Sequence, residues 1–171
     1  VGSAGEYHAQ VFKPPASVNP DRAKAIEQFR PALAKRGRAA AGKAVFEQRC
    51  AVCHELGGVG RAIGPDLKST RANGAEKMLV SLIDPNREVA PQYLLFTVHL
   101  AKDDGALVGM IGNENASLVE LIQPDGSRKS VRRADVRSIE STGLSLMPAG
   151  LEAGLSPGQM ADLLAWVMET P

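Results

Sequence analysis

Residues 50–54 read Cys-Ala-Val-Cys-His, and this segment constrains the chain more than any other part of its sequence. Two thiols three positions apart, followed directly by a histidine, form the attachment signature of a c-type haem. Each thiol can add to a porphyrin vinyl group as a thioether, and the adjacent imidazole then reaches the iron. The sequence therefore predicts one covalently attached haem c, with Cys50 and Cys53 as its anchors and His54 as the proximal iron ligand.

Two other interpretations of the cysteine pair stay open at this point. A redox dithiol needs a preceding strand in a thioredoxin-like βαβ context, whereas residues 39–49 are rich in alanine and predict a helix. A structural zinc site needs four ligands, usually from two separated pairs. The chain has two cysteines only, and His8 and His99 are isolated.

Charge and hydropathy exclude several classes of partner. The formal net charge is +1, which predicts no nucleic-acid footprint and no strong long-range steering. No apolar run approaches the roughly 18 residues that a membrane span needs. Because haem is attached covalently on the oxidising side of the membrane, we expect a periplasmic or otherwise extracytoplasmic protein.

The chain is expected to hold one haem domain behind a leader. Residues 1 to about 19 have no periodic apolar pattern, and residues 1–39 predict a leader or linker with one short helix, which Asn19 caps and Pro20 opens. Residues 40–171 are then the haem domain. Its first helix, over 40–49, delivers the cysteines.

Other local patterns predict how the helices of this domain begin, end and pack. Gly42 and Phe46 share one face, which suits a close crossing with another helix. Residues 73–76 and 156–159 both have the pattern of a capping box, so we expect a helix to begin at each. Pro85 is expected to end the first of these two helices.

The loop that follows His54 is expected to complete the site. It is rich in glycine over 55–63 and leads into Gly-Pro-Asp-Leu. A metal-bound histidine usually donates its second ring N–H to a carbonyl or carboxylate, and the carbonyl of Pro65 is the best candidate. The side chain of Arg61 is a candidate contact for a haem propionate, or it is simply solvated.

Residues 93–141 change from a helical period to an alternating one. Leu94, Phe96 and Val98 alternate with more polar neighbours, which indicates a strand. Asp104 and Gly105 predict a hairpin turn. We expect a small antiparallel sheet, a meander of about five strands over 94–100, 106–111, 117–122, 128–131 and a short run near Ile139.

Several of these segments together resemble a class I cytochrome c, and in finer detail the haem-binding domain of the planctomycete/verrucomicrobial type. The resemblance covers roughly residues 40–169. It rests on Gly42 to Phe46, the 50–54 motif, Val59 to Leu67, Ile83 to Arg87, Gly109 to Ile111, and Leu144 to Pro148 with the helix that follows.

This resemblance implies a mainly α cytochrome c fold with a small antiparallel β-sheet inserted between the middle helix and the methionine-ligand loop. It also implies that His54 and Met147 are the axial ligands. Domains of this type occur at the C-terminus of larger extracytoplasmic proteins, including sugar-dehydrogenase-like β-propellers. We therefore expect the partner to be a redox protein or a fused dehydrogenase domain.

The choice of the sixth ligand favours Met147. It lies in a loop stiffened by Pro148, directly before the last helix, where a class I cytochrome needs its ligand. The alternatives are an open or water-bound position, His99 and Met110. The other methionines lie on apolar helix faces and are expected in the core: Met78, Met160 and Met168.

A basic cluster over residues 128–137 has two interpretations. It contains Arg128, Lys129, Arg132, Arg133 and Arg137. The first interpretation is a docking face for an acidic partner. The second is a solvated hairpin, which is the better interpretation because charge runs are usually solvated.

The function expected from these features is that of a one-electron carrier and not an enzyme, either free or as the electron-transfer domain of a larger redox protein. The alternative is a gas-binding or catalytic haem domain with an open sixth coordination site.

Overall fold

The computed structural model describes residues 19–102 and 105–171. They divide into two compact units. The helical unit comprises residues 19–87 and 148–171, and the sheet unit comprises residues 88–102 and 105–147. No helix among these residues is long and apolar enough to span a membrane.

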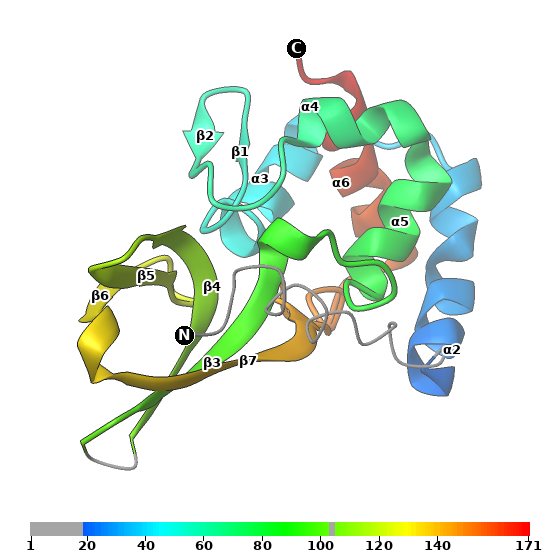
Figure 1. The fold of residues 1–171 in the computed structure, drawn as a ribbon. Helices are drawn as coiled ribbons and strands as arrows, with labels where there is room; N and C mark the ends of the chain where they lie inside the picture. Colours follow the sequence, from blue (N-terminus) through cyan, green and yellow to red (C-terminus); the bar gives the residue numbers. More distant parts are fainter. Residues whose placement is uncertain (1–18, 103–104) are drawn as a thin grey trace. The chain divides into compact units, whose positions relative to one another are not determined.

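The helical unit contains five α-helices, and the 3-10 turn η2 joins two of them, α4 and α5, directly. Its elements are α2 (Pro20–Phe29), the 3-10 turn η1 (Arg30–Ala34), α3 (Ala39–Arg49), β1 (Glu55–Leu56), β2 (Val59–Gly60), α4 (Leu67–Thr70), η2 (Arg71–Asn73), α5 (Ala75–Ile83) and α6 (Pro157–Glu169). Figure 1 shows α6 among the other helices, and it packs against α2, α3, α4 and α5.

The core of the helical unit collects the apolar faces of these helices. Ile26 and Phe29 come from α2, so part of the expected leader is packed into this unit. The largest fully buried side chains here include Phe46, Leu79, Ile83, Met160 and Leu163. Burial of such side chains is the main favourable term that holds the helices together.

Local signals determine most of the helix ends. Asn19 accepts a hydrogen bond from the Asp21 N–H at the start of α2, as expected. At α6 the side chains of Ser156 and Gln159 form both hydrogen bonds of the predicted capping box, with Pro157 at the first helical position. Pro85 follows the end of α5 at Ile83.

The predicted capping box at the start of α5 is wrong. Asn73 lies in the 3-10 turn η2, and Gly74 is the residue before α5, without a capping side chain. Gly74 has φ +88°, a left-handed conformation that glycine adopts without steric cost. The chain thus leaves one short helical turn and enters the next helix through a glycine, which shifts the start of α5 by one residue.

The sheet unit is a five-stranded antiparallel sheet preceded by the short turn η3 (Pro91–Tyr93). Its strands are β3 (Leu94–Leu100), β4 (Ala106–Glu114), β5 (Leu118–Ile122), β6 (Arg128–Arg132) and β7 (Val136–Ser145), with η4 (Arg133–Asp135) before β7. In sequence the sheet follows α5 and precedes Met147. The turn expected at residues 104–105 falls partly outside the described residues.

The strand order corrects the expected meander. β3, β4, β5 and β6 are neighbours in sequence order, but β7 returns to pair with β3, so the order is β6-β5-β4-β3-β7 (Figure 1). Val98 in β3 and Val119 and Leu121 in β5 are fully buried in its core. Pairing with the apolar strand β3 buries Val136 and Ile139 against this core, which pairing with the polar strand β6 does not offer.

Candidate haem-binding site

The cysteine pair lies on a tight turn at the end of α3. The N–H groups of Cys53 and His54 both donate to the carbonyl of Cys50, at 3.1 and 2.9 Å. This turn brings the two side chains and the imidazole together directly after the helix. Cys50 and Cys53 are not joined in a disulfide.

The His54 ring is buried and oriented by one hydrogen bond. His54 is only 8% exposed, and Nδ1 of its ring lies 3.1 Å from the carbonyl oxygen of Pro65. Because a carbonyl can only accept, Nδ1 carries the proton and Nε2 keeps its lone pair. Burial lowers the pKa of His54, and the hydrogen bond to Pro65 opposes this in part. The ring is therefore neutral at neutral pH, the state that binds a metal.

The loop after His54 is tied back onto the turn. The N–H groups of Arg61, Ile63 and Gly64 donate to main-chain carbonyls of residues 51 and 53, at 2.7–3.1 Å. A Cβ on Gly64 would lie 2.5 Å from Cε1 of His54, so only glycine lets the loop pass this close to the ring. The side chain of Arg61 is exposed, and its contact with a propionate stays a prediction.

The environment of the thiols does not suit the other two interpretations of the pair. Burial raises the pKa of Cys50 to about 11 and also raises the pKa of Cys53. Redox dithiols and zinc ligands react as thiolates, which a low pKa favours. Among residues 19–102 and 105–171, moreover, no group of three or more His, Cys, Asp or Glu side chains is placed to hold a metal ion.

Residues 37–94 match a model of the family described as cytochrome C oxidase, cbb3-type, subunit III. The match supports a c-type cytochrome haem-binding domain. Such a domain implies covalently bound c-type haem and, in general, electron transfer. The matched residues are about a third of the chain and include α3, the 50–54 motif and α5; they end at Leu94, the first residue of β3. A search among curated proteins found no match.

The candidate sixth ligands all belong to the sheet unit. Met147 is half-buried, and its N–H donates to Oγ of Ser145 at 3.1 Å. Met110 is buried within β4. Nε2 of His99 lies 3.8 Å from a carboxylate oxygen of Glu140 on the neighbouring strand β7. Of the methionines expected in the core, Met160 is fully buried, and the other two are half-buried.

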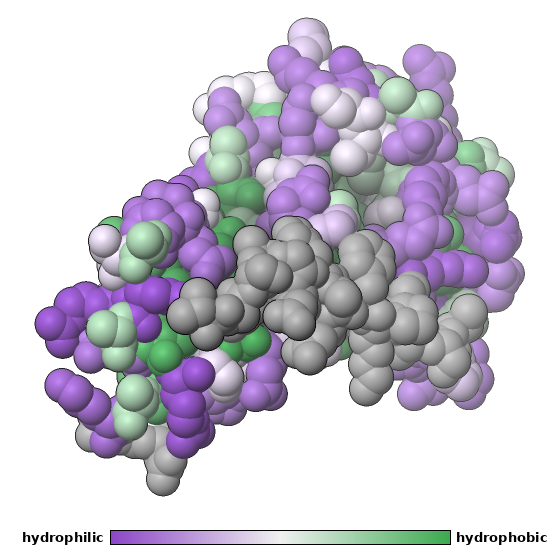
Figure 2. Space-filling view, in the orientation of Figure 1, coloured by the Kyte–Doolittle hydropathy of each residue, from purple (hydrophilic) through white to green (hydrophobic). Residues whose placement is uncertain are grey.

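The basic cluster over residues 128–137 is largely matched by carboxylates. Arg132 pairs with Asp135 and Arg133 with Glu114, both at 2.7 Å, and Arg128 pairs with Glu120. Figure 2 shows hydrophilic side chains gathered around this part of the sheet unit. These pairings favour the solvated hairpin over a docking face for an acidic partner.

Two kinds of residue near the site were not predicted from the sequence. The contact of Gly64 with the histidine ring had a signal, because a glycine directly before the expected acceptor Pro65 indicates a close approach of the backbone. No sequence pattern indicated the contacts of Arg49, Arg22 and Glu152, since these contacts join segments that are far apart in the sequence.

Proposed function

We propose that this chain is a single-haem c-type cytochrome that carries one electron. Cys50 and Cys53 are the thioether anchors, and His54 and Met147 are the axial ligands. The observation that carries the proposal is the buried imidazole of His54, with Nδ1 held by the carbonyl of Pro65, on the turn that also carries Cys50 and Cys53. This donor set fits a covalently held haem, and the family match over residues 37–94 supports it.

The haem, when bound, supplies the one-electron couple of its iron. The protein residues determine which state is favoured and what else can bind. The hydrogen bond from His54 to Pro65 holds the ring in one tautomer and makes Nε2 a better donor. A thioether from Met147 is a neutral, soft ligand that favours the ferrous state and occupies the position that oxygen or peroxide needs. Occupation of the sixth position by Met147 favours a carrier over a catalyst.

The cellular setting follows from the same chemistry and is part of this proposal. Covalent attachment of haem places the protein in the periplasm or another extracytoplasmic compartment. The partner is a redox protein or a dehydrogenase domain in the same polypeptide. The closer resemblance to the planctomycete/verrucomicrobial type is consistent with a fused domain.

The substitution Met147→Ala tests this proposal. We expect the haem to stay covalently attached while the sixth position opens. The ferric spectrum should become high-spin or water-ligated, and the protein should gain affinity for cyanide and, when ferrous, for carbon monoxide. The reduction potential should fall by a measurable part of the roughly 0.8 V range that axial ligands span.

The matched control is Met168→Ala, which removes a half-buried methionine from α6. It should leave the spectrum and the potential unchanged. An unchanged spectrum in Met147→Ala would show that Met147 is not the ligand. Ready binding of carbon monoxide by the unmutated ferrous protein would favour the gas-binding alternative.

A further inference from the structure

The eight residues from Pro148 to Leu155, here called the 148–155 loop, follow Met147 and precede Ser156, the N-cap residue of α6. Arginine side chains hold this loop from two sides. The loop has no regular secondary structure apart from local turns, such as those closed by the N–H groups of Ala153 and Leu155. Its main-chain carbonyls are bound by one arginine and its only acidic side chain, Glu152, by another.

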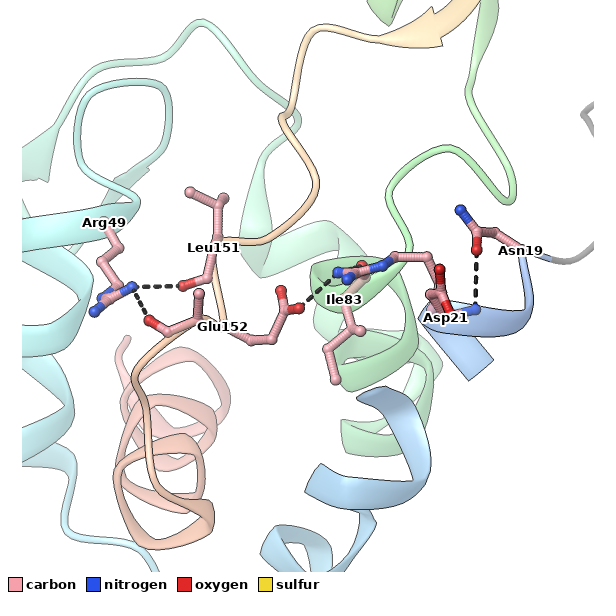
Figure 3. Close-up of polar contacts among 8 residues, drawn as sticks. Asn19, Asp21, Arg49, Ile83, Leu151 and Glu152 are labelled. Atoms are coloured by element: carbon pink, nitrogen blue, oxygen red, sulfur yellow. Dashed lines mark hydrogen bonds and ion pairs between the residues drawn. The ribbon is translucent and has the colours of Figure 1, made fainter. Parts of the chain in front are cut away.

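The first arginine is Arg49, the last residue of α3 and the neighbour of the haem anchor Cys50. Its Nη1 donates to the carbonyl oxygens of Leu151 and Ala153, both at 2.9 Å. Figure 3 shows its side chain reaching the loop at Leu151. Hydrogen bonds from a charged donor contribute more than those from a neutral donor. One side chain therefore ties the helix end that carries the cysteines to the loop that follows Met147.

The second contact is the ion pair between Arg22 of α2 and Glu152. Nη1 of Arg22 lies 2.6 Å from Oε1 of Glu152, and Glu152 is only 5% exposed. The same nitrogen also approaches the carbonyl of Ile83 at the end of α5, at 3.5 Å. In Figure 3 the Glu152 side chain points away from Arg49 and toward Ile83. A buried carboxylate with one partner is costly to uncouple, so this pair resists opening of the loop.

We propose that Arg49 and the Arg22–Glu152 pair are positioning residues that keep the 148–155 loop closed and thereby keep the thioether of Met147 on the iron. This inference rests on the proposed function, in which Met147 is the sixth ligand. A thioether is a weak ligand, so the closed loop determines how often the sixth position is free. Opening of the loop exposes that position to any competing ligand.

The test compares Arg49→Gln with the unmutated haem-loaded protein in a titration of the ferric state with imidazole. Imidazole binds only when the sixth position is free, so its apparent affinity reports the open population. We expect binding to tighten roughly tenfold, because two hydrogen bonds from a charged group are lost. Amide hydrogen exchange over residues 148–155 should accelerate by a similar factor. Arg49→Lys, which keeps the charge, should restore part of both effects.

The matched control is Arg71→Gln. Arg71 also donates to a main-chain carbonyl of the helical unit, that of Thr170, but it does not contact the 148–155 loop. A general loss of stability would move both variants alike. We expect Arg71→Gln to leave imidazole binding and exchange in the loop unchanged.

The outcomes separate this inference from the proposed function. If Met147→Ala opens the iron while Arg49→Gln binds imidazole like the unmutated protein, the positioning role is wrong and the carrier function stands. If Met147→Ala changes nothing, the proposed function itself fails. Should Arg49→Gln not yield folded protein, Glu152→Gln is titrated in its place, and an unchanged imidazole affinity there overturns the positioning role.

Discussion

Gly64 shows how a missing side chain shapes the candidate site. Its N–H donates to the carbonyl of Cys53 at 2.7 Å, and its Cα passes beside the ring of His54. A side chain at position 64 would overlap the His54 ring, since a Cβ would lie 2.5, 2.9 and 3.0 Å from three atoms of that ring. The orientation of His54 toward Pro65 thus depends on a neighbour that offers no side chain.

We therefore predict that Gly64→Ala disturbs both stability and ligation. The ring must move or the loop must shift, at a cost of about 1–3 kcal/mol in the free energy of unfolding. Denaturant unfolding and the spectrum of the haem-loaded protein measure the two effects. Gly158→Ala is the control, because a Cβ there meets only Oγ of Ser156 at 3.7 Å. Equal stability of the two variants would contradict the prediction.

Helices α3 and α6 cross closely, as the sequence predicted from Gly42 and Phe46. Gly42 lies where a Cβ would be 1.8 Å from the carbonyl oxygen of Asp162. One turn later, the rings of Phe46 and Trp166 pack with their centroids 6.4 Å apart. The predicted close crossing of the 40–49 helix is confirmed by this contact. The small residue permits the approach, and the aromatic pair fills the space beside it.

Gly42→Ala is expected to push these helices apart. The overlap is with main-chain atoms, which cannot rotate away, so we predict a loss of at least about 1–3 kcal/mol. Thermal unfolding of the haem-loaded protein measures it. Ala44→Gly, at an exposed position of the same helix, should cost only about 0.5–1 kcal/mol through backbone entropy. A neutral Gly42→Ala would mean that the helices do not cross this closely.

At the scale of the whole molecule, both the sheet unit and the helical unit contain fully buried apolar side chains. The sheet core contains Val98, Val119 and Leu121, and the helical core includes Phe46 and Leu163, all of them fully or almost fully buried. Local opening in proteins follows such contiguous units.

Truncations in the two cores should have separate effects. Val119→Ala should cost about 2 kcal/mol and accelerate amide exchange chiefly in strands β3 to β7. Leu163→Ala should cost about 2–5 kcal/mol and act chiefly on α3, α5 and α6. Hydrogen exchange followed by mass spectrometry resolves the two sets of peptides. If Val119→Ala accelerates exchange in α3 and α6 as strongly as in the sheet, the chain behaves as one cooperative unit.

The features that the sequence alone predicted correctly depend on neighbours within a few positions. The capping box at α6, the cap at Asn19, the proline after α5 and the strand over residues 94–100 are of this kind. Backbone conformation and capping act over one turn, so short patterns carry the information. The turn over residues 50–54 is local in the same way, because hydrogen bonds among adjacent residues close it, while the role of these residues in holding a haem stays a prediction.

Only the tertiary structure decided the features that join distant segments. The pairing of β7 with β3 follows from the burial of apolar side chains against a core that no local pattern describes. The contacts of Arg49 with the carbonyls of Leu151 and Ala153, and of Arg22 with Glu152, join residues more than a hundred positions apart. No sequence pattern relates an arginine on a helix to a carbonyl in a distant loop, so their hydrogen bond forms only when packing brings the two segments together.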